Sequence, residues 1–176
     1  MRSRGTFVIA ALAAAFAAAP AAGQSLQEEM IRDIEGVRDK YVGLAQAVPE
    51  AEYTWRPGEG VRSVGEVYMH VVSANYRLPD MIGVEPPEGT SSAWLNGTAE
   101  GLTQADAVEA LEASFAFTIE LLRGISDERL RESAEVFGRP TNVLGFLMLA
   151  QTHLHEHLGQ SIAYARTRGV TPPWSR

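Results

Sequence analysis

Residues 142–168 read NVLGFLMLAQTHLHEHLGQSIAYARTR and contain no proline. Apolar side chains recur every three or four positions from Val143 to Tyr164, which is the spacing of one face of an α-helix. Gly169 and then Pro172 follow, as glycine and proline commonly do where a helix ends. We therefore predict one long amphipathic helix over this range, with Thr141 as its N-cap.

This predicted helix carries three of the chain's four histidines, at positions 153, 155 and 157. His153 and His157 are four positions apart, so they project from the same helical face about one turn from each other. His155 points to nearly the opposite side, and we expect it to face solvent. One helix thus offers two imidazoles to a single metal ion.

Three earlier segments have the same helical periodicity, over about 25–47, 63–77 and 103–123. The first two begin with capping boxes, in which a serine is followed three positions later by glutamate: Ser25-Leu26-Gln27-Glu28 and Ser63-Val64-Gly65-Glu66. Thr103 opens the third. These segments and the C-terminal one predict four helices.

The predicted helices are joined by connections of unequal length. Residues 81–102 are rich in Pro, Gly, Ser and Thr, and we expect Trp94 within them to anchor onto the core or over a pocket. Residues 125–139 are predicted to form a short helical turn and a polar link, and no part of the chain has a convincing strand pattern. The fold class is therefore all-α, a four-helix bundle in one domain. The long second connection means that the helices need not alternate strictly in direction.

The N-terminal residues 1–23 have the pattern of a secretory signal peptide. Two arginines precede an apolar, alanine-rich run from Phe7 to Ala19, which is shorter than the ~20 residues of a membrane-spanning helix. We predict cleavage between about Ala21 and Gln24. The domain at 24–176 would then be periplasmic or secreted, with no stable membrane insertion; a retained N-terminal anchor is the alternative.

The composition excludes several classes of function. The chain has no cysteine, which rules out disulfides, thiolate metal sites, iron–sulfur clusters and a cysteine nucleophile. Histidine, aspartate and glutamate remain as metal ligands. The formal net charge is -7 and the sequence holds no basic block, so we expect no nucleic-acid partner.

A third imidazole would complete a common catalytic arrangement, in which three protein ligands leave one position of a divalent ion open. His70 lies with the apolar stripe of the second predicted helix and is the only other histidine able to face inward. The alternative is that these histidines are satisfied by hydrogen bonds.

The zinc-protease motif H-E-x-x-H is absent, because Gly159 stands where its second histidine would fall. Glu66, one turn before His70, is a fourth ligand, a base or, most simply, a helix cap.

Four motifs in order resemble the DinB/YfiT-like superfamily of metal-dependent four-helix bundles, over essentially the whole mature chain. They are Trp55-Arg56-Pro57, Arg62-Ser63-Val64-Gly65-Glu66 followed by His70, His153-x-x-x-His157-x-Gly159-Gln160, and Arg168-Gly169-Val170-Thr171-Pro172-Pro173-Trp174. The resemblance implies one divalent metal ion, nickel or zinc, held by His70, His153 and His157. Gln160 falls on the same helical face and is a candidate for orienting a ligand, as is Glu66. We expect Gly159 to allow close packing against a neighbouring helix.

The resemblance leaves three functions open. Relatives of this superfamily include thiol-dependent S-transferases, although export argues against a cytosolic thiol cofactor. A metal-dependent hydrolase acting on an ester, an amide or a similar bond is the second. The third is a non-catalytic metal-binding or stress-associated bundle. The small-molecule substrate is unknown, and a homodimer is compatible with the sequence.

Overall fold

The computed structural model describes residues 25–175, and the predicted signal peptide lies outside them. Four long helices form the body of the protein: α1 Leu26–Ala47, α2 Val64–Arg77, α4 Gln104–Gly124 and α5 Val143–Thr167. A short helix, α3 Ser92–Asn96, interrupts the long connection. Short 3-10 turns lie at Glu50–Glu52, Leu78–Ile82, Arg129–Arg131 and Pro173–Ser175. The four predicted helices are confirmed.

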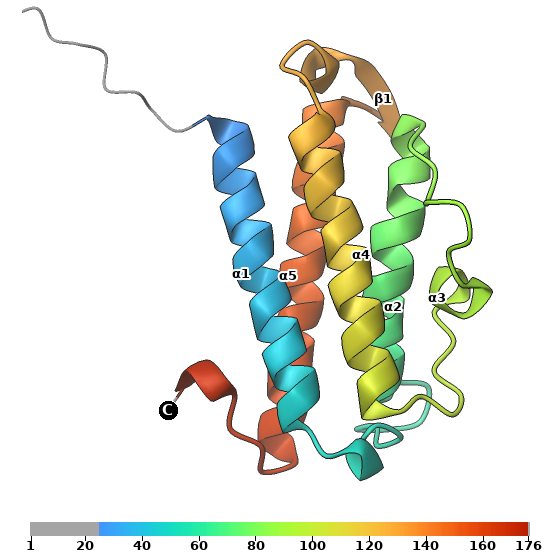
Figure 1. The fold of residues 1–176 in the computed structure, drawn as a ribbon, viewed down its shortest axis with the longest axis vertical. Coiled ribbons are helices and arrows are strands. Elements are labelled where there is room, and N and C mark those ends of the chain that lie inside the picture. Colours follow the sequence, from blue (N-terminus) through green and yellow to red (C-terminus); the bar gives the residue numbers. More distant parts are fainter. Residues whose placement is uncertain (1–24, 176) are drawn as a thin grey trace, which may run out of the picture.

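The helices run in the order down, up, up, down when viewed with the start of α1 at the top (Figure 1). α4 packs against both α1 and α2, and α5 packs against the same two helices. Because α2 and α4 are parallel, the connection between them must cross the length of the bundle, and α3 lies on this crossover. α2 and α5 are antiparallel neighbours although they are distant in sequence. This pairing positions the site described below.

Capping boxes fix where the first three long helices begin. The side chains of Ser25, Ser63 and Thr103 each accept a hydrogen bond from the third backbone N–H of the helix, and the acidic side chain at that position bonds back. The prediction for α5 is wrong in detail, since its N-cap is Asn142 rather than Thr141. The Asn142 side-chain oxygen accepts from the backbone N–H of Gly145 at 2.8 Å.

A β-hairpin precedes α5, where the sequence predicted only a polar link. Strand β1 (Ser133–Val136) pairs antiparallel with β2 (Arg139–Asn142), and Val136 lies opposite Arg139. The two turn residues, Phe137 and Gly138, have φ of 49° and 75°. Positive φ at both positions matches the type I′ turn, whose twist suits a two-residue hairpin. The expectation of no strand is therefore wrong at this point, although the fold remains a helical bundle.

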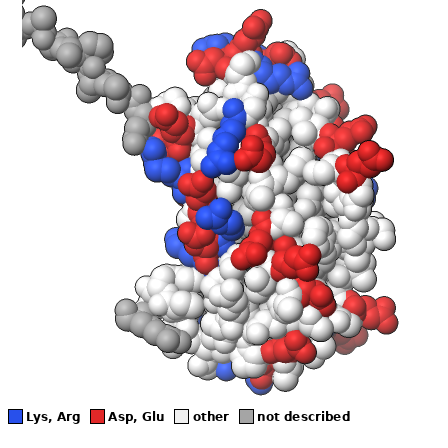
Figure 2. Space-filling view, viewed as in Figure 1, with Lys and Arg blue, Asp and Glu red and all other residues white. Residues whose placement is uncertain are grey.

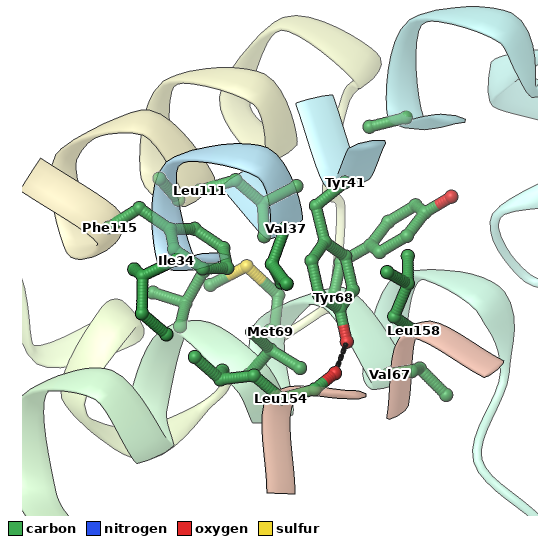
Figure 3. Packing of buried hydrophobic residues seen from close by; sticks show 14 of the residues in the cluster. Ile34, Val37, Tyr41, Val67, Tyr68, Met69, Leu111, Phe115, Leu154 and Leu158 are labelled. Carbon is green, nitrogen blue, oxygen red and sulfur yellow. Dashed lines mark hydrogen bonds between the residues drawn. The ribbon is translucent and has the colours of Figure 1, made fainter. Parts of the chain in front are cut away.

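The core lies between the four long helices and is rich in tyrosine (Figure 3). Tyr41 of α1 is fully buried, and its hydroxyl donates to the backbone oxygen of Leu154 in α5 at 2.9 Å. Tyr68 of α2 meets the Tyr41 ring edge-on, at 6.5 Å between centroids. Trp94 stacks on Tyr76 at 6.2 Å, so it anchors the crossover on α2 as predicted.

The surface carries acidic and basic side chains together along α1, whereas the lower part of the face over α4 is mostly acidic (Figure 2). This face shows no basic patch. None of the helices between residues 25 and 175 combines the length and the apolar character needed to cross a bilayer.

Candidate metal centre

Three histidine rings meet between α2 and α5, near the middle of both helices. They belong to His70, His153 and His157, each partly buried, and one nitrogen from each lies within 4.8 Å of the others. The centroid of the His157 ring is 4.6 Å from those of both His70 and His153. His153 and His157 therefore lie on the same face of α5, as predicted from their spacing. The packing of α2 against α5 brings His70 to them.

The His70 and His153 rings face each other through Nε2, with 3.1 Å between the two nitrogens. Nitrogen ligands at about 2.0–2.1 Å from one tetrahedral zinc ion lie about 3.3 Å apart, so the observed spacing fits a shared ion closely. Nδ1 of His153 is buried without a hydrogen-bond partner among the described residues. The contact of the His153 ring within the cluster is therefore the Nε2–Nε2 hydrogen bond with His70, which a shared metal ion would replace.

The environment keeps these imidazoles uncharged. Burial lowers the pKa of His70 to about 4, and the positive charge of Arg62 and the two neighbouring histidines act in the same direction. Burial also lowers the pKa of His153, an effect that His157 and Arg62 reinforce and the Glu156 carboxylate opposes. Neutral imidazole is the form that binds a metal ion, so both rings have the required protonation state at neutral pH.

His157 is oriented by a chain of hydrogen bonds along α5. Its Nδ1 donates to Oε1 of Gln160 at 2.8 Å, and Nε2 of Gln160 donates to the Tyr164 hydroxyl at 2.8 Å. A neutral His157 that donates through Nδ1 keeps its Nε2 lone pair free for a metal. Tyr164 is itself buried, and the Trp55 ring meets it edge-on at 5.5 Å. Gln160 thus has the position predicted for a group that orients a ligand, and Tyr164 extends that role.

His155 lies outside the cluster. It is exposed, and its Nε2 forms a 2.8 Å hydrogen bond with the carboxylate of Asp33 on α1, which also accepts from Gln151. The predicted division of the three α5 histidines into two inward residues and one outward residue is confirmed.

Glu66 lines the cleft beside His70 but is engaged at both carboxylate oxygens. Oε2 accepts from the backbone N–H of Ser63 at 2.6 Å, and Oε1 pairs with Arg56 at 3.0 Å. The hydrogen bond from the Ser63 amide is the largest influence on the pKa of Glu66, and together with Arg56 it outweighs burial and holds this pKa below its usual value. Glu66 is therefore a helix cap, as the simplest interpretation of the sequence held.

An open cleft of about 360 Å³ adjoins His70. Its wall includes Arg56 and Arg62 from the loop before α2, Glu66 from the first turn of α2 and Asn96 from the end of α3. The crossover thus lines one side of the cleft, and α2 with its preceding loop lines the other. A small organic molecule fits in this volume with one end at the histidine cluster.

Two features of the site differ from the sequence interpretation or escape it. Gly159 has no atom within 4 Å of where a Cβ would stand, so the expectation of close packing at this glycine is wrong. Arg62 was noted only as part of a motif, yet it lines the cleft and acts electrostatically on His70 and His153. The sequence signal for this role was the position of Arg62, directly before the capping box of the helix that carries His70.

Similar proteins share this architecture. The crystal structure of a DinB-like protein from Bacillus cereus ATCC 10987 has a TM-score of 0.71 at 19% identity, covering 83% of this chain and 95% of that one. YfiT from Bacillus subtilis, described as a probable metal-dependent hydrolase with an unusual four-helix bundle topology, has a TM-score of 0.62 at 15% identity, covering 87% and 94%. The uncharacterised protein YjoA of Bacillus subtilis (strain 168) is 25% identical over 131 residues, which are 73% of this chain and 81% of YjoA.

The family model of the DinB superfamily matches residues 33–161, from α1 through all three histidines of α5. The match covers most of the chain and includes all three members of the histidine cluster. The chain belongs to the DinB superfamily.

Proposed function

We propose that this protein binds one divalent metal ion through His70, His153 and His157. We propose further that it is a hydrolase whose activity depends on this ion. The observation that carries the proposal is the convergence of three imidazoles, from two helices, beside an open cleft. Protein sites with three ligands and an open position are typical of catalytic metals. The description of YfiT as a probable metal-dependent hydrolase supports the same class.

The donor set favours nickel or zinc as the metal. Imidazole nitrogen suits zinc, copper, iron and nickel, whereas magnesium and calcium prefer oxygen ligands. Among the described residues that line the cleft beside His70, Glu66 is the only carboxylate, and Ser63 and Arg56 already engage it. The site thus offers nitrogen rather than oxygen, which argues against a hard cation.

A divalent ion held by these residues supplies a Lewis acid and lowers the pKa of water. The chain's own residues then have three tasks. His70 and His153 stay uncharged because burial lowers the pKa of each. Gln160 fixes the ring of His157. The cleft admits an organic substrate with an ester, amide or similar bond to the edge of the cluster.

One observation favours a second candidate, transfer of a thiol group. Hydrolysis benefits from a carboxylate base near the open position, and both oxygens of Glu66 are already occupied. A thiol nucleophile needs no such base once its pKa is lowered. A metal-binding bundle without catalysis is the remaining outcome, and it predicts a bound metal with no turnover of esters, amides or thiols.

Metal analysis of the purified protein tests the proposal. We expect about one nickel or zinc ion per chain, and no metal in His153→Ala. The control is His155→Ala, which removes a histidine from the same helix outside the cluster and should keep full occupancy. Full occupancy in His153→Ala would refute the metal site. A screen of the loaded protein with esters, amides and thiols then distinguishes the three functions.

We also propose export. The support is the sequence pattern of residues 1–23, and the test is the N-terminus of the protein recovered from the cells that make it. Mass spectrometry should find a chain that begins between about Ala22 and Gln24 outside the cytoplasm. A full-length chain in the cytoplasm would contradict the proposal.

A further inference from the structure

The cleft beside the histidine cluster contains one cation that the protein does not neutralise. Arg62 lines the cleft together with His70, and no acidic side chain pairs with it among residues 25–175. An exposed guanidinium beside a candidate reaction centre is a ready partner for an anion.

The other charges of the cleft cancel. Arg56 pairs with Glu66 at 3.0 Å and also donates to the backbone oxygen of Val61 at 3.2 Å. Glu66 in turn caps α2, so each of its oxygens has a partner other than Arg62. Arg62 is therefore the charged side chain of the cleft lining that has no ion-pair partner among the described residues. The lining offers this one unpaired positive charge, in addition to that of any metal ion bound at the cluster, in a protein whose net charge is -7.

We propose that the substrate is a small carboxylic acid, whose carboxylate binds Arg62 while its reacting group lies at the three-histidine cluster. This inference rests on the proposed function and specifies its substrate class. A carboxylate matches the planar, forked guanidinium with two parallel hydrogen bonds. A carboxylate carries one negative charge, which the one unpaired guanidinium among the described lining residues balances. The volume of about 360 Å³ suits a molecule that spans from Arg62 to the cluster.

Hydroxamates provide a test that does not depend on turnover, because the hydroxamate group binds metal ions directly. The probes are the monohydroxamates of succinate, glutarate and adipate, each with a free carboxylate, and uncharged alkyl hydroxamates of the same lengths. The protein is loaded with cobalt(II), and its visible absorption spectrum is titrated with each probe. We expect at least one carboxylate probe to bind about tenfold more tightly than its uncharged counterpart, as one charge-assisted bidentate contact gives.

Variants assign this preference to the arginine. Arg62→Gln should bind both kinds of probe equally, and Arg62→Lys should keep part of the preference because it keeps the charge but loses the fork. Arg77→Gln is the matched control: Arg77 is an exposed arginine at the opposite end of α2 and outside the cleft, so the full preference should remain. Because Arg62 is exposed, its replacement should leave the circular dichroism spectrum unchanged.

The outcomes separate this inference from the metal site. If the wild type takes up no cobalt, the proposed function fails and the inference falls with it. If cobalt binds and uncharged hydroxamates shift the spectrum as strongly as every carboxylate probe, only the anion site is refuted. A preference that survives in Arg62→Gln would likewise refute the role of Arg62.

Discussion

Nδ1 of His157 lies 2.8 Å from Oε1 of Gln160, one helical turn further along α5. This contact determines which nitrogen of the imidazole faces the cluster, because a ring that donates through Nδ1 presents the lone pair of Nε2. The same amide is fixed from its other side by Tyr164. A single helix thus carries a metal-ligand candidate together with the residues that orient it.

Replacing the orienting amide should weaken metal binding without abolishing it. In Gln160→Leu the His157 ring loses its acceptor, and we expect the affinity for zinc to fall about tenfold, as for other residues that support a metal ligand. Tyr164→Phe, which removes only the partner of the amide, should have a smaller effect. Competition with a coloured chelator measures both. An unchanged affinity in Gln160→Leu would show that the contact is not needed to position the ring.

The stability of the bundle should depend on pH through Asp33. Burial raises the pKa of this carboxyl, but hydrogen bonds from His155 and Gln151 outweigh it and the net pKa is lowered. A lowered pKa in the folded state adds stability above the unfolded value of about 3.9, and this is lost as the pH falls through the folded value. The wild type should therefore exceed Asp33→Asn in free energy of unfolding at neutral pH, and the difference should shrink below about pH 4. Urea titrations across this range measure it, and a constant difference would contradict the assignment.

Removing the hydroxyl group should change the free energy of unfolding differently at two buried tyrosines whose rings meet edge-on. Tyr41 donates to Leu154, so Tyr41→Phe should lower the free energy of unfolding by about 1 kcal/mol. The hydroxyl of Tyr68 is buried and has no partner among the described residues, so Tyr68→Phe should be neutral or stabilising. Thermal and urea unfolding compare the two variants directly. Equal losses in both would show that the Tyr68 hydroxyl is also bonded in solution.

The hairpin turn should be improved by asparagine. Phe137 adopts φ of 49°, a conformation that costs most residues energy but that asparagine tolerates. We expect Phe137→Asn to raise the free energy of unfolding by about 0.5–1 kcal/mol. Gly138→Ala, at φ of 75°, should lower it by about 1 kcal/mol. If both changes were neutral, the turn would not be held in this conformation in solution.

The helices were predictable because local chemistry determines their ends. Ser25 and Ser63 begin capping boxes that form as expected, and periodic apolar residues fill each helix between cap and stop. The hairpin was not predictable from the sequence, because its turn begins with phenylalanine. Asparagine or glycine is the usual residue at the first position of a type I′ turn. Thr141 and Asn142 are both good N-caps, and the structure shows that it is the Asn142 side chain that accepts from the first turn of α5.

The candidate site was predictable in part. The four-residue spacing of His153 and His157 required only a helix, whereas bringing His70 to them required the pairing of α2 with α5, which no local pattern encodes. Gly159 shows the limit of arguing from residue type alone, since no neighbour approaches it. The role of Arg62 depends on Glu66 being occupied by Ser63 and Arg56, and such an assignment of hydrogen bonds is visible only in three dimensions.

The pairing of α2 with α5 has a consequence for when a metal can be acquired. His70 and His153 are separated by 83 positions, and α5 is the last long helix of the chain. In a growing chain His70 is therefore made well before His153 and His157, and the three imidazoles converge only after α5 has docked against α2. Uptake of the proposed metal ion would accordingly follow this docking. For an exported chain that folds after translocation, the metals available at its destination, rather than those of the cytoplasm, would decide which ion it carries.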